Sequence, residues 1–378
     1  MSSRAAGRFY TAGLWLKQFP GWRRRQRPDS VRNILVLHHL LLGDSLMAMA
    51  LVSALRQQYP EAQIVLALPK AFVCLFDSHP WGVRAIGWDP RDLGSLQALN
   101  HLPTADLCYL PADNRYSWLA RGLGARWIIG FANDRPAYKN WMLDAAIPYS
   151  VAPSAWSDTV AELAGAPAPR PYRRSDWPSP VAEKLPLAAL NHSTPYVVLH
   201  VGASSVLKQW PAERWHTLAK RLEQAGLQPV WSAGVQETAL VQACDPEQRW
   251  SSTAGLLSLN QLWRLIENAR LLVSPDTGVA HLGRITMTPT LCLFGPGSAL
   301  LCGAGRFWSH SPYQALSQPI ACRDQTSNFQ RQIPWIRRCE RFIGHAPGQC
   351  PEARCMQHLE VDQVIQAALT LLQEASTT

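Results

Sequence analysis

From residue 33 onward, short runs of aliphatic and β-branched residues alternate with longer segments of helical periodicity. In the first half, the runs that predict strands are 33–37, 63–68, 83–88, 106–110 and 127–131. In the second half they are 196–201, 229–232, 271–274 and 290–294. The clearest helical patterns are 44–58, 212–224, 258–268 and 361–373. Strands that alternate with helices in this way predict βαβ units, parallel sheets and therefore an α/β fold.

A proline-rich segment separates the two alternating regions. Seven prolines fall between residues 167 and 195, and each removes a backbone donor that a helix or sheet would use. A chain of 378 residues also exceeds the size that one core comfortably fills. We therefore expect two Rossmann-like domains that face each other across a cleft, with ligands at the carboxyl ends of the strands. The expected divisions are a basic segment at 1–32, domains at 33–166 and 196–355, a linker at 167–195 and a C-terminal helix at 356–378.

The positive charge is concentrated at the N-terminus. The whole chain carries a net charge of +9, and residues 1–32 hold seven arginines and one lysine against the single acid Asp29. The remainder is close to neutral, which argues against a nucleic-acid partner. No apolar run approaches the roughly 18 to 20 residues that span a bilayer.

Residues 1–30 combine these cations with bulky apolar side chains, including Phe9, Leu14, Trp15 and Leu16. Lys17 interrupts any apolar core of a signal peptide. Two interpretations stay open. The segment is either an interfacial anchor on an anionic membrane surface or a disordered basic tail, since its glycines weaken a helix.

The nine cysteines are an odd number and too sparse for a secreted disulfide scaffold, which favours a reducing cytoplasmic setting. Four of them precede the last helical pattern, namely Cys322, Cys339, Cys350 and Cys355. Their spacing lacks the C-x2-C knuckle of a typical zinc site. We expect ordinary thiols and no metal, with a four-cysteine metal site as the weaker alternative.

The segment from Ser274 to His281 is the strongest candidate site, because a strand, a tight turn and a helix start come together there. Gly278 leaves the backbone open to a ligand, and the free N–H groups of a first helical turn favour a phosphate. On a helix, His281 shares a face with Thr277. Asp276 either caps the helix or binds sugar hydroxyls. The alternative for the whole segment is a capped helix without a ligand.

Two further loops follow predicted strands. Asp44 comes directly after Gly43 and either accepts a proton from a hydroxyl nucleophile or caps a helix. In the second half, Ser204, Ser205 and Lys208 follow the first strand. The lysine either contacts phosphate as a mobile point charge or is solvated.

A glutamate occupies the corresponding place after the next strand. Glu237 follows Gly234 at the end of the predicted strand 229–232. Its carboxylate either accepts hydrogen bonds from a ribose or lies in a first helical turn, where the helix dipole favours an acid.

Together these segments resemble glycosyltransferase family 9, the ADP-heptose:lipopolysaccharide heptosyltransferases. The motifs that carry the resemblance are, in order, Gly43-Asp44, Lys208-Gln209-Trp210-Pro211 through Trp215, Gly234 through Glu237, Asp276-Thr277-Gly278 through His281, and Phe294-Gly295-Pro296. The resemblance extends from about residue 33 to the C-terminal helix.

The resemblance implies a GT-B fold and metal-independent, inverting transfer of a heptose, without a cofactor. The donor would be ADP-heptose and the acceptor a lipopolysaccharide inner core. Domain 33–166 would bind the acceptor and domain 196–355 the nucleotide-sugar. Asp44 would be the general base, Glu237 would hold the nucleoside and Asp276 the donor sugar. The implied diphosphate contacts are Lys208, Thr277, Gly278 and His281.

Some residues depart from the family pattern or hold a secondary place in it. Arg284 follows His281 where the family has small residues, and it either adds a phosphate contact or is solvated. Residues 38–42 replace the usual basic and polar residues before Gly43, which bears on the choice of sugar and acceptor. Ser204 and Ser205 are secondary candidates for the phosphate site.

Two other functions remain open. One is a protein O-heptosyltransferase that acts on an autotransporter, favoured if the cysteines bind a metal. The other is an inactive nucleotide-binding partner of an envelope assembly. In each case we expect a cytoplasmic protein, peripheral on the inner membrane if residues 1–30 attach to it.

Overall fold

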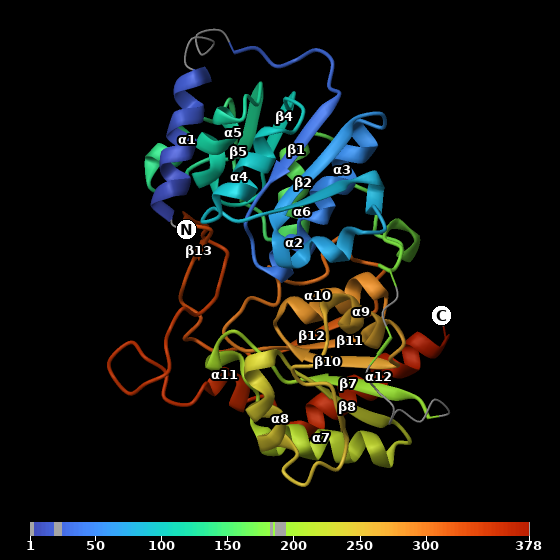
Figure 1. Ribbon diagram of the computed structural model, residues 1–378. Helices are drawn as coiled ribbons and strands as arrows, with labels where there is room; N and C mark the ends of the chain where they lie inside the picture. Colours follow the sequence, from blue (N-terminus) through green and yellow to red (C-terminus); the bar gives the residue numbers. More distant parts are fainter. Residues whose placement is uncertain (1–3, 19–24, 182–183, 186–193, 378) are drawn as a thin grey trace. The chain divides into compact units, whose positions relative to one another are not determined.

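The computed structural model describes residues 4–18, 25–181, 184–185 and 194–377. The chain divides into two compact units (Figure 1). Unit 1 contains Met1–Arg170, Asp176–Pro180 and Ser327–Trp335, and unit 2 contains Pro171–Ser175, Val181–Thr326 and Ile336–Thr378. Each unit is described by itself.

The described residues of unit 1 form a six-stranded parallel sheet in the order β3-β2-β1-β4-β5-β6. Its strands are β1 (Asn33–Leu37), β2 (Gln63–Pro69), β3 (Arg84–Trp88), β4 (Leu107–Leu110), β5 (Trp127–Phe131) and β6 (Ala145–Ile147). In β1, Ile34 pairs with Ile64 of β2 on one side and with Leu107 of β4 on the other. The strand order reverses between β1 and β4, which makes that edge the expected ligand position.

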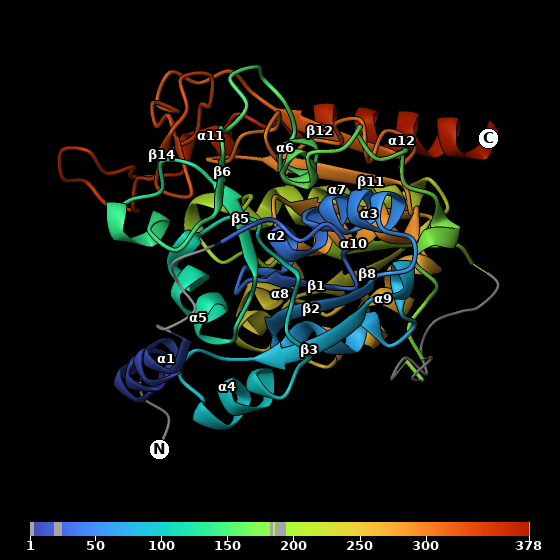
Figure 2. The same ribbon diagram turned by 90° about the horizontal axis from the view of Figure 1, so that it is seen from above.

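Helices cover both faces of this sheet, as Figure 2 shows. They are α1 (Arg4–Gln18), α2 (Leu42–Met47), α3 (Met49–Gln58), α4 (Leu93–Asn100), α5 (Ser117–Gly122) and α6 (Trp156–Ala161). On one face, Leu35 and Leu37 of β1 share a core with Leu96 of α4, Leu119 of α5 and Leu14 of α1. On the other face, α3 packs against α6.

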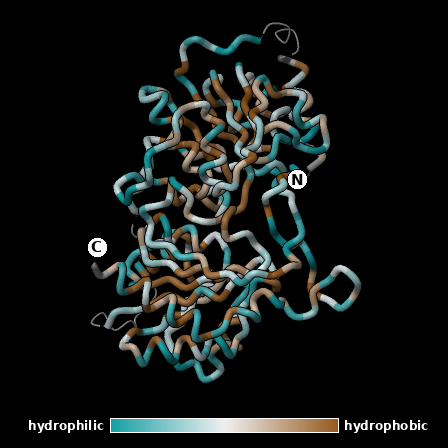
Figure 3. Tube along the Cα trace, turned by 180° about the vertical axis from the view of Figure 1, so that it is seen from behind, coloured by the Kyte–Doolittle hydropathy of each residue, from teal (hydrophilic) through white to brown (hydrophobic). Residues whose placement is uncertain are grey.

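Unit 2 repeats this strand order. Its described residues form a six-stranded parallel sheet ordered β9-β8-β7-β10-β11-β12. The strands are β7 (Tyr196–His200), β8 (Gln228–Ser232), β9 (Ser251–Ser252), β10 (Leu271–Pro275), β11 (Thr290–Phe294) and β12 (Tyr313–Ser317). The helices are α7 (Ala212–Gln224), α8 (Thr238–Cys244), α9 (Leu259–Glu267), α10 (Gly278–Thr286), α11 (Arg354–Gln357) and α12 (Val361–Thr377). Two parallel sheets with alternating helices confirm the α/β fold class, and hydrophobic stretches of the chain run through the interior of each unit (Figure 3).

Most predicted elements are present, with instructive differences. The single helix expected over 44–58 is divided into α2 and α3 at Ala48. Strands β6, β9 and β12 were not predicted, because they are very short or are half-buried along their length. A small antiparallel hairpin of β13 (Ser327–Asn328) and β14 (Arg331–Gln332) belongs to unit 1, although the expected C-terminal domain of 196–355 includes it.

The N-terminal segment is not a disordered tail over its described part. Residues Arg4–Gln18 form α1, which packs on α5 and α4. Leu14 is buried in the core of unit 1, and a Cβ on Gly7 would lie only 2.3 Å from the carbonyl oxygen of Pro90. Gly7 therefore permits a close approach that any larger residue would prevent. Phe19 and Trp22, which also support the anchor interpretation, lie outside the described residues.

The expected linker is anchored at two points rather than free. The Tyr172 hydroxyl donates to the Ile285 carbonyl at 2.8 Å within unit 2, and the Trp177 indole donates to the Leu75 carbonyl at 2.9 Å within unit 1. Both side chains are fully buried. Residues 182–183 and 186–193 of this segment lie outside the described residues. Among the described helices, none has both the length and the apolarity to cross a membrane.

Candidate functional site

In unit 2, the loop after β7 meets the turn after β10. The Lys208 ammonium donates to the main-chain carbonyl of Asp276 at 2.7 Å and to its carboxylate at 3.0 Å. Burial alone lowers the pKa of Lys208, but the adjacent carboxylate outweighs burial and raises it above its ordinary value. The lysine is therefore a fixed positive charge at neutral pH, and it lies where the strand order reverses.

The turn after β10 leads directly into α10. Thr277 is the N-cap, and its hydroxyl accepts a hydrogen bond from the Val279 N–H at 3.3 Å. Asp276 therefore does not cap the helix, since its carboxylate is engaged by Lys208. Gly278 is the first helical residue. Its position leaves a helix N-terminus beside a lysine, an arrangement suited to an anion.

His281 is buried in α10, four residues after the N-cap. Burial, followed by the positive charges of Arg284 and Lys208, lowers its pKa well below the ordinary value. Its ring is therefore neutral at pH 7. Among the described residues, its Nδ1 atom has no hydrogen-bond partner. Such an atom has hydrogen-bonding capacity to offer a ligand.

Glu237 follows β8 and lies against the loop after β7. Its carboxylate accepts a hydrogen bond from the Gly234 N–H at 2.9 Å. A Cβ on Gly202 would lie 2.0 Å from the same carboxylate oxygen, so only glycine allows this approach. In the same loop Ser205 accepts from the Leu207 N–H at 3.3 Å, and Ser204 is exposed. The sheet thus brings together the loops that hold Lys208, Glu237 and Asp276.

The structure contradicts the interpretation of Arg284 as a solvated residue. Its side chain is fully buried, so it is not solvated. The guanidinium donates to the carbonyl oxygens of Cys302 and Gly303 and lies 3.6 Å from the centroid of the Tyr313 ring. With two of its nitrogens donating to main-chain carbonyls and its face on an aromatic ring, this arginine holds the residues around 302–313, and a phosphate contact stays a prediction.

The four C-terminal cysteines all lie in the described part of the chain. All four carry free thiols, and no group of three or more His, Cys, Asp or Glu among the described residues is placed to hold a metal ion. The Cys339 sulfur instead accepts from the Arg341 N–H at 3.4 Å. Cys355 is buried, which raises the pKa of its thiol to about 11. The weaker alternative of a four-cysteine site therefore has no support in the described part of the chain.

In unit 1, Asp44 lies in the first turn of α2, close after the end of β1. The N-cap of α2 is Leu41, and Gly43 is the second residue of the helix. Asp44 is therefore not the N-cap, contrary to one of the two interpretations of this residue. Its half-buried carboxylate is at the edge where the strand order of unit 1 reverses.

A cavity of about 940 Å³ lies in the same unit. Its lining includes residues of α1, of the segments that follow β1, β3, β4 and β5, of α4 and α5, and of the β13–β14 hairpin, so it borders the carboxyl edge of the sheet. The cationic residues of its lining are Arg8, Arg91, Arg115, Arg135 and Lys139. None of these five residues belongs to a sequence motif, so no local pattern marks them as a group. Their only common signal is a place in loops after predicted strands or in the N-terminal segment.

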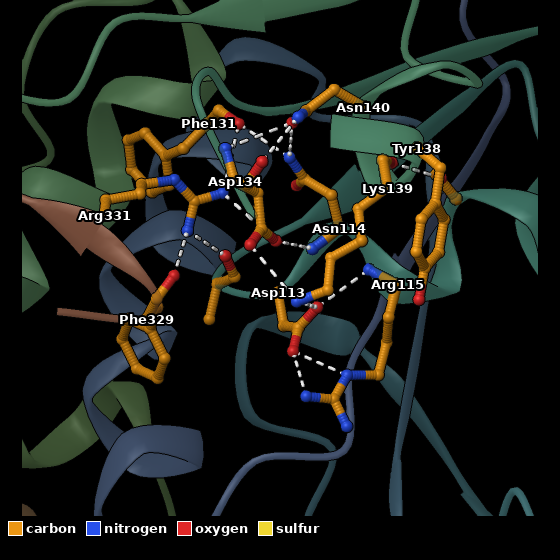
Figure 4. A network of polar contacts seen from close by, with 12 residues as sticks. Asp113, Asn114, Arg115, Phe131, Asp134, Tyr138, Lys139, Asn140, Phe329 and Arg331 are labelled. Atoms are coloured by element: carbon orange, nitrogen blue, oxygen red, sulfur yellow. Dashed lines mark hydrogen bonds and ion pairs between the residues drawn. The ribbon is translucent and has the colours of Figure 1, made fainter. Parts of the chain in front are cut away.

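A buried ion-pair network organises two of these loops (Figure 4). Lys139 is buried between Asp113 and Asp134, at 3.1 and 3.2 Å. Asp113 also pairs with Arg115. Burial alone raises the pKa of Asp113, but the hydrogen bonds and charge of Arg115 outweigh burial and lower it.

The hairpin of β13 and β14 completes this network from a distant part of the sequence. Arg331 is buried, donates to the main-chain carbonyls of Phe131 at 3.1 Å and Ala132 at 2.8 Å, and lies 3.6 Å from Asp134 (Figure 4). Residues that follow β4 and β5 are thereby held by a residue about 200 positions later. No local pattern predicts this contact.

Two Rossmann-like units that place ligand-binding loops at the carboxyl ends of parallel strands define the GT-B class of glycosyltransferases. The fold is similar to that of E. coli ADP-heptose lipopolysaccharide heptosyltransferase II, with a TM-score of 0.67 and 19% identity, over 91% of this chain and 99% of that one. Residues 107–331 match the family model of glycosyltransferase family 9 (heptosyltransferase). The chain therefore belongs to this family and is a glycosyltransferase.

Curated relatives agree with this assignment. Over 327 residues the chain is 21% identical to lipopolysaccharide core heptosyltransferase OpsX of Haemophilus influenzae, covering 81% of this chain and 90% of that protein. Over 148 residues it is 33% identical to lipopolysaccharide heptosyltransferase 1 of Pseudomonas aeruginosa. This second alignment spans 38% of the chain and 41% of the relative, which is less than half of that protein's length.

Proposed function

We propose that the protein transfers a heptose from ADP-heptose to a lipopolysaccharide inner-core acceptor, with inversion and without a metal ion. The observation that carries the proposal is the contact of Lys208 with Asp276 beside the N-terminus of α10. A diphosphate leaving group needs its charge neutralised. A fixed lysine and a helix N-terminus supply that neutralisation without Mg²⁺.

On the donor side, Lys208, the N–H groups around Thr277 and Gly278, and the open nitrogen of His281 hold the diphosphate. Asp276 orients the donor sugar and Glu237 the nucleoside. Ser204 and Ser205 lie in the same loop as Lys208 and are second-rank contacts. In this assignment the loop after β8 binds the nucleoside, whereas the loops after β7 and β10 together bind the diphosphate and the loop after β10 also orients the sugar.

On the acceptor side, Asp44 acts as the general base, with Gly43 keeping the turn before it open. As the acceptor hydroxyl loses its proton to the Asp44 carboxylate, its oxygen forms a bond to the anomeric carbon. The bond from that carbon to the diphosphate breaks on the opposite face, and ADP carries away the electron pair. Attack from the opposite face gives inversion.

A panel of nucleotide-sugars tests the proposal directly. We expect transfer from ADP-heptose, lower or no transfer from other nucleotide-sugars, and unchanged rates in EDTA. Rates that EDTA abolishes and Mg²⁺ restores would contradict the metal-free mechanism. Nucleotide binding without any turnover would instead select the inactive envelope-assembly partner.

Protein O-heptosylation of an autotransporter is less favoured. The sequence interpretation tied that alternative to a cysteine-bound metal, and the described residues contain no group placed to hold one. An assay with a lipopolysaccharide acceptor and an autotransporter fragment side by side separates the two acceptors. Transfer to the protein fragment alone would reverse our preference.

We also propose that α1 attaches the protein to the anionic cytoplasmic face of the inner membrane. Phe9 and Leu16 are 78% and 64% exposed and lie seven residues apart, hence on one outward face of α1. Basic residues of the same segment add attraction to anionic lipid. Deleting residues 1–30 would expose the core around Leu14, so point variants are the better test.

The test compares vesicle binding of the double variant Phe9→Ser/Leu16→Ser with that of Val151→Ser, which removes an exposed apolar side chain elsewhere in unit 1. We expect the double variant alone to bind anionic vesicles less well, and higher salt to weaken wild-type binding. Equal binding by the two variants would refute attachment through α1.

A further inference from the structure

Helix α1 precedes the first strand of the fold, yet it forms one wall of the 940 Å³ cavity in unit 1. The helix is fixed in place by the buried Leu14, by the close approach of Gly7 to Pro90 and by its packing on α5. Arg8 and Trp15 of α1 line the cavity, and the Trp15 ring lies 5.8 Å from that of Trp118. The docking that buries one face of α1 therefore presents these side chains to the cavity.

The charge of the cavity is positive and only partly compensated. Of its five cations, Arg115 and Lys139 are paired with Asp113, and Lys139 also with Asp134. Arg8, Arg91 and Arg135 are exposed and form no ion pair within the described part of the chain. Of the lining residues only Asp89 is acidic.

The histidine in this lining adds no charge. Burial lowers the pKa of His39, and Arg91 and Arg115 lower it further against the opposing effect of Asp89. His39 is therefore neutral at pH 7. A cavity with three uncompensated arginines and one carboxylate favours an anionic ligand, because guanidinium groups bind carboxylate and phosphate in a bidentate manner.

Aromatic side chains form another part of the lining, namely Trp15, Trp88, Tyr116, Trp118 and Tyr138. The indole N–H groups of Trp88 and Trp118 donate to main-chain carbonyls, which fixes these two rings, and the aromatic rings give the cavity flat apolar surface. That combination suits a sugar ring, which has apolar C–H faces and hydroxyl edges. Arginines and aromatic rings together therefore point to an anionic saccharide rather than to an inorganic ion.

We propose that α1 is part of the acceptor site, where Arg8, together with Arg91 and Arg135, binds the negative charge of the saccharide acceptor and Trp15 covers its ring. The inference rests on the proposed function, because the cavity borders the edge of the sheet at which β1 leads to Asp44. Helix α1 would then contribute to the choice of acceptor, although it precedes both domains that the sequence predicts, 33–166 and 196–355.

The test compares Arg8→Ala with Arg84→Ala in the full-length protein. Arg84 is an exposed arginine of β3 in the same unit and does not line the cavity. Loss of one charge-assisted contact is worth about ten-fold or more in affinity. We expect Arg8→Ala to raise the acceptor KM about ten-fold, with kcat, donor KM and thermal stability unchanged, and Arg84→Ala to behave as wild type.

A second measurement separates this inference from the proposed function. Glucuronate, glucose 6-phosphate and glucose are titrated calorimetrically, and we expect the two anions to bind better than glucose, by a margin that Arg8→Ala removes. Preference for glucuronate assigns a carboxylate-bearing acceptor, and preference for glucose 6-phosphate assigns a phosphorylated one.

Different outcomes test the proposed heptose transfer and the proposed acceptor role of the cavity. Arg8-dependent binding of an anion without heptose transfer would refute the proposed function but would support the proposal that the cavity binds an anionic saccharide. An unchanged acceptor KM in Arg8→Ala, with heptose transfer established, would overturn the cavity proposal alone.

Discussion

Units 1 and 2 order their strands identically but differ in how the chain leaves the fourth strand. In unit 2 only Asp276 and Thr277 separate β10 from α10, so the helix N-terminus opens directly at the carboxyl edge. In unit 1, residues 111–116 separate β4 from α5, and Asp113 and Arg115 of that segment belong to the buried network. The same topology therefore yields a helix start suited to an anion in one unit and an arginine-rich cavity in the other.

The comparison teaches that the fold supplies positions, whereas turn length and local charge decide the ligand. The loop after the first strand shows the same contrast. In unit 2 it carries Lys208, and in unit 1 it leads to Asp44. We therefore propose charge neutralisation by unit 2 and proton acceptance by unit 1.

The largest expected effect is on turnover. Asp44→Asn keeps the size of the side chain but cannot accept the proton, so kcat should fall roughly 10²- to 10⁴-fold. Donor KM should stay close to that of wild type, because all the donor contacts that we propose lie in unit 2. Turnover within a few-fold of wild type would remove Asp44 as the base.

The next effect is on the stability of unit 1. Arg331→Met leaves Asp134 short of one partner and removes the arginine donor from the main-chain carbonyls of Ala112 and Ala132, which should cost about 3 to 5 kcal/mol in the free energy of unfolding. Arg126→Met removes an exposed partner of Asp106 and should cost less than about 1 kcal/mol. Urea unfolding measures both, and equal losses would contradict a special role for the network.

A smaller effect is expected on the pH dependence of the free energy of unfolding, and it should be similar in the two units. His38, just after β1, and His200, at the end of β7, are buried, and burial lowers their pKa values to about 3 and about 4 from 6.5. Below pH 6.5 the unfolded chain binds more protons than the folded one, so stability is lost as pH falls towards 4. At pH 5 each histidine should account for about 2 kcal/mol.

Neutral replacements check this assignment. His38→Asn and His200→Asn should each flatten the fall in unfolding free energy between pH 6.5 and 5, while leaving stability above pH 7 with little further pH dependence. An unchanged slope in both variants would show that other groups cause the acid sensitivity.

The sequence predicted the parts of this division that depend on local pattern. The strand, the two-residue turn and the helix around Thr277 are encoded within a dozen residues. The loop that contains Lys208 is marked in the sequence by Trp210 and Pro211, which follow the lysine closely. Strands β6 and β12 lie at sheet edges and are not fully buried, so they lack a strong hydrophobic signal.

The remaining features depend on contacts between distant residues. Arg284 is buried because Tyr313 and the carbonyls at 302 and 303 surround it. The docking of α1 depends on Gly7 meeting Pro90, and the Arg331 contacts join residues about 200 apart. None of these is visible in composition or periodicity.

Calorimetric titration of ADP into Asp44→Asn and Lys208→Ala, side by side, tests the division of labour most directly. We predict wild-type affinity for Asp44→Asn and an affinity lowered roughly 10- to 100-fold for Lys208→Ala. Lys220→Ala, which removes an exposed lysine of α7, is the matched control and should bind as wild type. Wild-type affinity in Lys208→Ala, or an equal loss in the Asp44 and Lys208 variants, would contradict the assignment of donor binding to unit 2 and acceptor chemistry to unit 1.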